Sequence, residues 1–196
     1  MENIIDLLRE SGAMLEGHFI LSSGRHSDKY FQCAKLLQYP DKARMALEQV
    51  VAAIKKDISL GKLKIDIAAG PAMGGIIAAW EVARQLGIPS LFTERDENGV
   101  MSLRRGFELN HKQNVLIVED VVTTGKSSLE CAASLAAGGA NIAALACLVD
   151  RRADESRDIP WPFYPAIKLK AFNWEQADCD MCKRLIPAVK PGSRKI

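Results

Sequence analysis

Two adjacent acidic residues, Glu119 and Asp120, follow a run of apolar residues and directly precede Val-Val-Thr-Thr-Gly-Lys-Ser-Ser. The apolar run predicts a buried strand, and the small polar residues predict the start of a helix. Backbone N–H groups and hydroxyls at a helix N-terminus bind phosphate, whereas adjacent carboxylates suit sugar hydroxyls or a magnesium ion. The pattern therefore predicts a site for a sugar phosphate.

A nucleotide-binding loop and a structural turn are the two alternative interpretations of this segment. Gly125-Lys126-Ser127 matches the end of the nucleotide-binding pattern G-x-x-x-x-G-K-[ST], but that pattern needs glycine where this chain has Asp120. A purely structural strand-to-helix turn is the other alternative, although buried acids without a partner are costly. A sugar-phosphate site is the interpretation that uses all of these residues.

The elements that position this segment alternate between strands and helices. Pro40 and Asp41 begin a predicted helix with one apolar stripe, formed by Ala43, Ala46, Leu47, Val50, Val51 and Ile54. Predicted strands cover 64–70, 90–93, 114–120 and 141–150, and predicted helices end at Gly87 and near Leu135. Continuous apolar strands between helices indicate an α/β fold with a parallel sheet covered on both faces, which binds ligands at the carboxyl ends of its strands.

Two polar segments lie outside this alternation. Residues 19–31 predict a strand, a glycine-containing turn and a second strand, after a short N-terminal helix that ends at Gly12. Residues 94–107 are charged and contain Asn98-Gly99, which predicts a hairpin-like or mobile loop that can act as a lid.

Composition narrows the class of protein. The 196 residues fit one domain, and 26 basic against 24 acidic residues provide no strong field for nucleic acid. No stretch approaches the roughly 20 apolar residues that span a bilayer. An odd set of five cysteines suits reduced thiols. We expect a cytoplasmic protein that binds neither membrane nor nucleic acid.

The segment from Glu119 to Ser127 resembles the phosphoribosyl pyrophosphate motif of the type I phosphoribosyltransferases, and residues 69–76 resemble the pyrophosphate loop of that family. The resemblance implies a Rossmann-like parallel sheet with a small hood, and Mg²⁺ held mainly through the substrate with no certain protein ligand. It implies that the donor is bound by Glu119, Asp120, Val121, Val122, Thr123, Thr124, Gly125, Lys126, Ser127, Gly70, Pro71, Ala72, Met73 and Gly74.

Three further segments resemble the orotate-using group of this family, which implies formation of orotidine 5'-phosphate and pyrophosphate in de novo pyrimidine (UMP) synthesis. The orotate-binding residues implied are Thr123, Arg151, Ser23, Lys29, Tyr30 and Phe31. For Arg151, a solvated surface arginine is the alternative. The implied organisation is a single domain over 1–196, with a core of about 41–173 and a hood from about 1–40 and the C-terminal segment.

The charged loop resembles the family's lid, which reaches into the neighbouring subunit of a homodimer. Lysines common in that lid are missing here, and Arg95, Arg104 and Arg105 are its basic residues. We therefore expect Arg95 and Arg104 to act with Glu119 and Asp120 in catalysis, by stabilising the leaving pyrophosphate while the acids oppose positive charge on the ribose.

Some alternatives stay open at this stage. The acceptor can be another base, and the chain can be a non-catalytic regulator that binds phosphoribosyl pyrophosphate, although no helix-turn-helix pattern is found. Cys179 and Cys182 have metal-ligand spacing, but one Cys-x-x-Cys is a weak signal when only His18, His26 and His111 exist elsewhere. We expect an inert pair, with a metal shared across a dimer or a redox pair as the alternatives.

Overall fold

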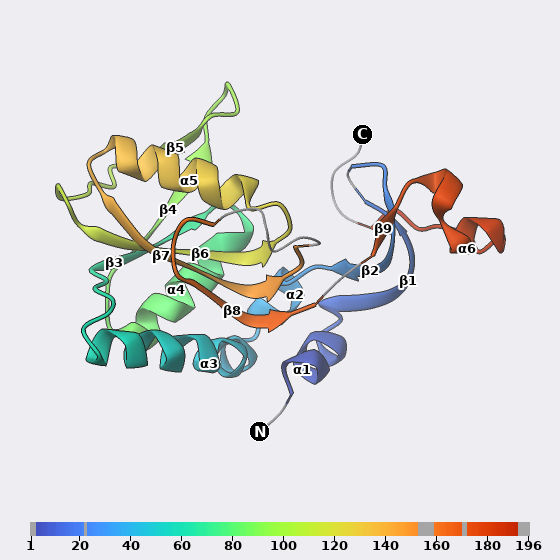
Figure 1. Cartoon of the computed structure of the whole chain (residues 1–196), viewed down its shortest axis with the longest axis horizontal. Coiled ribbons are helices and arrows are strands. Elements are labelled where there is room, and N and C mark those ends of the chain that lie inside the picture. The colour runs from blue at the N-terminus through green and yellow to red at the C-terminus, as the bar shows by residue number, and fades with distance from the viewer. Residues whose placement is uncertain (1–2, 22, 153–158, 170–171, 192–196) are drawn as a thin grey trace.

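The computed structural model describes residues 3–21, 23–152, 159–169 and 172–191. Two sheets organise these residues (Figure 1). The larger has the order β5-β4-β3-β6-β7-β8, and every neighbouring pair is parallel except β4 with β5. Its strands are β3 (Ile67–Pro71), β4 (Ser90–Arg95), β5 (Met101–Leu103), β6 (Asn114–Val122), β7 (Asn141–Asp150) and β8 (Phe163–Lys168). The predicted parallel α/β sheet is therefore confirmed.

Helices cover both faces of this sheet (Figure 1). One face packs against α3 (Pro40–Ser59) and α4 (Gly74–Leu86), and the other packs against α5 (Lys126–Ala137). All six residues of the predicted stripe on α3 are buried. Gly87 ends α4 in the left-handed conformation that favours glycine, as expected.

The smaller sheet is antiparallel and joins the two ends of the chain. It has the order β1-β2-β9, with β1 at Met14–Ile20, β2 at His26–Phe31 and β9 at Asn173–Trp174. We call this sheet together with residues 172–191 the hood. The hood lies to one side of the main sheet and includes the short helix α6 (Asp180–Lys183) (Figure 1).

Two short helices flank the β1–β2 hairpin along the chain. Helix α1 (Ile4–Glu10) has three buried residues, and Gly12 follows it with a positive φ, as predicted. Helix α2 (Ala34–Leu37) was not predicted from the sequence, and it leads from β2 into α3. Leu8, Leu36 and Leu47 are fully buried in the same core. The chain therefore passes from hood to core through packed structure.

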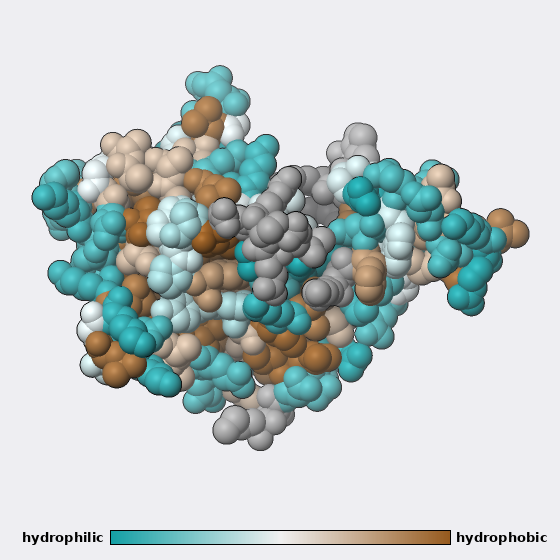
Figure 2. Space-filling view, in the orientation of Figure 1, coloured by the Kyte–Doolittle hydropathy of each residue, from teal (hydrophilic) through white to brown (hydrophobic). Residues whose placement is uncertain are grey.

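The surface is mostly hydrophilic on the face in Figure 2, where apolar residues gather in separate groups. Among the described residues, no helix is long and apolar enough to span a membrane. All five cysteines are free, and Cys33, Cys131, Cys147 and Cys179 are buried. Free thiols agree with the expectation of reduced cysteines.

Candidate functional site

The two predicted acids lie at the carboxyl end of β6, in the middle of the main sheet. Parallel neighbours β3 and β7 flank this strand. Glu119 is buried, with 8% of its surface exposed, and Asp120 is partly buried. The strand therefore delivers both carboxylates to the edge where a parallel sheet binds its ligands.

Burial gives these acids unusual proton affinities. Loss of hydration, with a smaller contribution from the charge of Asp120, raises the pKa of Glu119 to about 9. Burial also raises the pKa of Asp120, although the Val121 N–H, which donates to Oδ1 at 2.8 Å, opposes that rise. The two carboxylates therefore lack compensating positive charge. A cation can provide it, and a hydroxyl-bearing ligand can donate hydrogen bonds to them.

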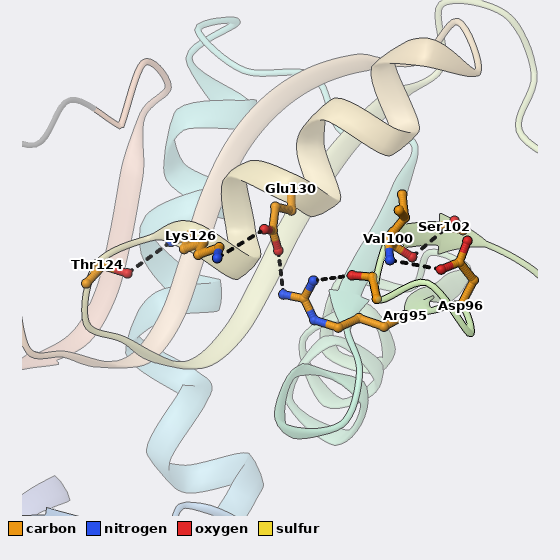
Figure 3. A network of polar contacts seen from close by, with 8 residues as sticks. Arg95, Asp96, Val100, Ser102, Thr124, Lys126 and Glu130 are labelled. Atoms are coloured by element: carbon orange, nitrogen blue, oxygen red, sulfur yellow. Dashed lines mark hydrogen bonds and ion pairs between the residues drawn. The ribbon is translucent and has the colours of Figure 1, made fainter. Parts of the chain in front are cut away.

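The loop after these acids forms a cavity of about 120 Å³ at the start of α5. Gly125 adopts a left-handed conformation, and the Leu129 N–H donates to its carbonyl at 2.9 Å as the helix begins. Thr124 Oγ1 accepts from the Lys126 N–H at 3.3 Å (Figure 3). The lining residues are Glu119, Val121, Val122, Thr123, Thr124, Gly125, Lys126, Ser127 and Ser128. These residues include the stretch in which the sequence analysis expects a phosphate to bind.

The glycine-containing turn between β3 and α4 touches the same acids. A Cβ on Gly75 would lie 2.9 Å from Glu119 Oε2, and one on Gly74 would overlap with the Asp120 carboxylate. A Cβ on Gly70 would lie 2.6 Å from the Gly75 carbonyl carbon. The two predicted motifs are therefore in close contact, and this packing requires glycine at these three positions.

The remaining turn residues, Pro71, Ala72 and Met73, lie between these glycines. The Ala72–Met73 peptide bond is cis, and Ala72 N–H donates to the Thr93 carbonyl at 2.7 Å. Met73 is 83% exposed.

Arg151 follows β7 and lies beside the phosphate loop, where its backbone N–H donates to the Val122 carbonyl at 2.8 Å. The side chain is buried, with its guanidinium carbon 4.8 Å from the Phe31 ring centroid. Burial lowers the pKa of Arg151, while Cys33 and Asp28 oppose the effect. Its Nε and Nη2 are buried without a hydrogen-bond partner in the described part of the chain. The alternative that Arg151 is a solvated surface arginine is therefore wrong. Two of its buried nitrogen donors lack the hydrogen-bond acceptors that buried polar groups normally have.

The hairpin residues named from the sequence lie in different settings. Ser23 is exposed in the turn, Lys29 pairs with Asp28 at 3.0 Å, and Phe31 packs into the core. Tyr30 and Phe31 point to opposite faces of β2, and the Tyr30 ring lies 5.9 Å from that of Phe19. Of these two aromatic residues, Phe31 is the one whose ring packs against the Arg151 guanidinium in the described structure.

Two residues near Arg151 were missed by the sequence analysis. Asp28 Oδ1 is buried with no hydrogen-bond partner among the described residues. Cys33 is fully buried, and the charges of Asp120 and Arg151 both act on its pKa, which burial raises well above its usual value. The sequence offered one indication of these residues: Asp28 lies within the predicted hairpin and Cys33 lies shortly after it.

The segment predicted to act as a lid is a hairpin formed by β4 and β5, whose turn is closed by Asp96. Asp96 Oδ1 accepts from the N–H groups of Asn98 and Val100, both at 2.9 Å. Arg95 donates to the Gly99 carbonyl at 2.7 Å and pairs with Glu130 of α5, which also lies 3.8 Å from Lys126 Nζ (Figure 3). The Glu130 carboxylate is therefore shared by Arg95, where the β4–β5 hairpin begins, and by Lys126 at the start of α5.

The other two lid arginines differ from each other. Arg105 makes a two-point contact with Glu94, at 2.8 and 2.9 Å, and its guanidinium carbon lies 5.8 Å from the Phe92 ring centroid. Arg104 is exposed and makes no hydrogen bond or ion pair within the described ranges. Arg104 is thus the lid cation available to an incoming anion.

Comparisons with known proteins agree with this geometry. Residues 42–180 match the model of the phosphoribosyl transferase domain. An orotate phosphoribosyltransferase of Heliobacterium modesticaldum is 44% identical over 193 residues, which cover 98% of each chain.

Solved structures share the fold. Orotate phosphoribosyltransferase from Aeropyrum pernix superimposes with a TM-score of 0.70 at 26% identity, covering 85% of this chain and 94% of that one. Adenine phosphoribosyltransferase from Thermoanaerobacter pseudethanolicus has a TM-score of 0.58 at 18% identity, covering 72% of this chain and 88% of that one. At that identity the likeness shows the fold alone, so the fold does not select the base.

Proposed function

The chain belongs to the phosphoribosyl transferase family, and from this premise we propose that it acts as an orotate phosphoribosyltransferase. It transfers the ribose 5-phosphate group of phosphoribosyl pyrophosphate to orotate in pyrimidine biosynthesis, which gives orotidine 5'-phosphate and releases pyrophosphate. One observation of the structure carries the choice of acceptor. It is the buried Arg151 guanidinium with two unpaired nitrogen atoms.

An orotate carboxylate satisfies what Arg151 lacks. Buried guanidinium donors without an acceptor are costly, and a planar guanidinium binds a carboxylate at two points. Neutral purines and uracil have no carboxylate to offer. Thr123 follows Val122, whose carbonyl is bonded to the Arg151 backbone, so both side chains can border one base. We assign the remaining base contacts to Ser23, Lys29, Tyr30 and Phe31 of the hairpin.

The donor occupies the carboxyl end of β6 in this proposal. The loop from Val121 to Ser127 holds the 5'-phosphate with its N–H groups and hydroxyls, and Glu119 and Asp120 accept hydrogen bonds from the ribose hydroxyls. The turn from Gly70 to Gly74 holds the pyrophosphate. Its contact with both acids supports this assignment, because it brings the leaving group beside the sugar.

Magnesium fits the chemistry of this site. Oxygen donors are the ligands that Mg²⁺ prefers, and the raised pKa values of Glu119 and Asp120 mark two carboxylates that lack positive charge nearby. We propose that Mg²⁺ is held mainly through the substrate, and we assign it no protein ligand. When bound, it neutralises charge on the departing pyrophosphate.

Catalysis then depends on fixed charges. As the bond between C1 and pyrophosphate breaks, the ribose ring becomes positive and the leaving group becomes more negative. Positive charge nearby favours the ionised forms of Glu119 and Asp120. In that form the two carboxylates oppose the ring's charge and fix its orientation. Arg104 stabilises the leaving group, while Arg95 anchors the lid through Glu130. As the bond from C1 to pyrophosphate breaks, a bond forms from C1 to the orotate ring nitrogen, whose proton passes to solvent. We therefore assign no residue as a strong base.

We also propose a homodimer in which the lid of one subunit completes the site of the other. The hairpin between β4 and β5 projects from the body of the chain, which suits a contact in trans (Figure 1). The rest of the chain forms a single domain with its hood, and free cysteines suit a cytoplasmic protein.

Subunit mixing tests the shared lid. Arg104→Ala alone is expected to keep about a tenth of wild-type activity and Asp120→Asn far less, but their mixed dimer has one site with an intact lid and intact acids. Mixing after unfolding should restore about a quarter of wild-type activity, since half of the dimers are mixed and each holds one complete site. No recovery in dimers shown by mass to be mixed would place the lid over its own subunit.

The acceptor is tested by incubating the protein with Mg²⁺, phosphoribosyl pyrophosphate and orotate, and by following the loss of orotate absorbance. Adenine, hypoxanthine, guanine and uracil serve as parallel acceptors. Consumption of orotate alone supports the proposal. Turnover of a neutral base in preference to orotate would contradict the role of Arg151, and tight donor binding without any turnover would favour a regulator.

A further inference from the structure

The hood contains a cluster of four metal-ligating side chains that the phosphoribosyl transfer reaction does not use. Cys179 and Cys182, which we expected to be inert, lie beside His18 of β1 and His26 of β2. One ligand atom from each residue lies within 4.8 Å of the other three. His18, His26 and Cys179 are buried, and Cys182 is half-buried. Two histidines separated from the cysteines by more than 150 residues are therefore brought to one point.

The distances within this cluster suit a tetrahedral metal. Cys179 Sγ lies 3.5 Å from His18 Nε2, and Cys182 Sγ lies 3.7 Å from His18 Nε2 and 3.3 Å from His26 Nδ1. Metal bonds of about 2.3 Å to sulfur and about 2.0 Å to nitrogen separate tetrahedral ligands by roughly 3.3–3.8 Å. His18 Nε2 and His26 Nδ1 are 2.6 Å apart, so a rotation of one ring that widens this pair completes the geometry.

The outer side of the cluster is also arranged as in a metal site. His18 Nδ1 lies 2.7 Å from the Ile186 carbonyl, which can only accept, so Nδ1 carries the proton and Nε2 presents its lone pair to the centre. Metal-ligating histidines commonly hold their second nitrogen in this way. The carbonyl comes from the segment that follows the two cysteines, so the same stretch of chain provides ligands and orients one.

The hood also needs an anchor. Among described residues 172–191, Cys179 alone is buried, and neither α6 nor the preceding 3₁₀ turn has a buried residue. This stretch cannot build an apolar core of its own, and small units of that kind are commonly held by disulfides or metals. Its backbone joins β1 beside His18, where the Val189 N–H donates to the His18 carbonyl at 2.8 Å. The cluster is the buried centre of that junction.

We propose that His18, His26, Cys179 and Cys182 bind one zinc ion that fastens the C-terminal segment to the β1–β2 hairpin. Two sulfur and two nitrogen donors in a tetrahedral arrangement select zinc among the common divalent ions. Because all four positions are filled by the protein, the ion is structural and leaves no site for substrate. It belongs to a single chain, in contrast to the dimer-shared metal considered from the sequence. The hairpin that it holds carries the hood residues assigned to orotate.

Metal analysis of the full-length protein tests this proposal. After purification without added metal and passage over a weak chelator, the wild-type chain should retain about one zinc per chain. Cys182→Ser and His26→Gln should each reduce the zinc content at least tenfold. Cys131→Ala and His111→Gln, which change the same residue types outside the cluster, should retain the metal. Zinc retained in both cluster variants would overturn the proposal.

Cobalt substitution provides a measurement that does not depend on the variants folding. Wild-type protein unfolded with chelator and refolded with Co²⁺ should show the visible bands of tetrahedral cobalt and a sulfur-to-cobalt charge-transfer band. Wild-type chain that is metal-free and takes up neither ion in competition with a weak chelator contradicts the proposal. So does a Cys179–Cys182 disulfide in freshly purified protein, detected as a mass two hydrogens lower. Orotate turnover is measured separately, so a failed zinc site leaves the activity proposal unaffected.

Discussion

The phosphate loop (Val121 to Ser127) and the hood, to which we assign different substrates, are built in opposite ways. In the first, Glu119 to Ser127 form a continuous stretch on one strand and the following turn, placed by the central sheet. In the second, β1 and β2 from one end of the chain pair with β9 near the other end. The shape of the loop therefore depends on the main sheet and the helices packed on it, whereas the hood depends on contacts between segments that are distant in the sequence.

Asp120→Asn should have the largest effect on activity and little on folding. The amide keeps the shape that packs against Gly74 but cannot oppose positive charge on the ribose, so kcat should fall by about 10²–10³. Steady-state kinetics and a thermal melt measure the two effects, with the exposed Asp41→Asn as the matched control. A large loss of melting temperature would break the distinction between the phosphate loop and the hood.

Arg151→Gln should raise the KM for orotate about tenfold to a hundredfold, because a charge-assisted hydrogen bond contributes about 1.5–3 kcal/mol. The KM for phosphoribosyl pyrophosphate should stay close to the wild-type value. Arg44→Gln, at an exposed position of α3, is the control. Equal rises in both KM values would mean that Arg151 supports the architecture rather than the base.

Arg104→Ala should lower kcat by roughly tenfold, since the loss of a leaving-group contact is moderated by solvent around the lid. Arg105→Ala is the matched variant on the same hairpin and should lower kcat less, because its guanidinium is already bound by Glu94. Kinetics under saturating substrates measure both. The reverse order would assign the leaving-group role to Arg105.

Glu119 should make stability depend on pH. Its folded pKa of about 9 exceeds the usual 4.5, so its contribution is fully present below pH 4.5 and is lost as the pH rises through about 9. Glu119→Gln removes this dependence and should flatten the decline in melting temperature between pH 5 and pH 9. Parallel curves for the wild type and the variant would show that the proton is not taken up on folding.

Glu130→Gln should have the smallest effect. Glu130 is shared by Arg95 and Lys126, but these pairs are partly exposed, and such contacts contribute about 0.2–1 kcal/mol. The ratio kcat/KM should therefore change less than about fivefold. A larger change, measured at low salt, would show that coupling between the lid base and the phosphate loop is part of catalysis.

Local patterns predicted most of the main sheet. The stripe on α3, the glycine end of α4 and the strand before Glu119 were all predicted from spacing, because each side chain's environment follows from its own element. Strand β8 was not predicted. It contains Pro165, which argues against an interior strand, but β8 pairs only with β7 and lies at the sheet edge, where proline is tolerated.

The candidate site divides in the same way. Glu119, Asp120 and the loop were predicted from one contiguous motif, and a resemblance added Arg151. The structure was needed to show that Arg151 is buried, that two of its nitrogen atoms are unpaired and that Asp28 lies nearby. These features depend on how the end of β7 packs against the β1–β2 hairpin. The availability of Arg104, in contrast with Arg95 and Arg105, likewise depends on which carboxylates lie nearby.

The sequence by itself determined the α/β architecture, the turn between β6 and α5 and the family, because strand periodicity and helix N-termini are encoded over a few neighbouring residues. Tertiary structure alone decided that the two glycine-containing motifs touch and that Arg151 is buried with unmet hydrogen bonds. It also decided that two histidines join a distant cysteine pair. Such contacts join residues that are far apart in the sequence. Residue spacing predicts local elements but does not predict which distant segments pack together.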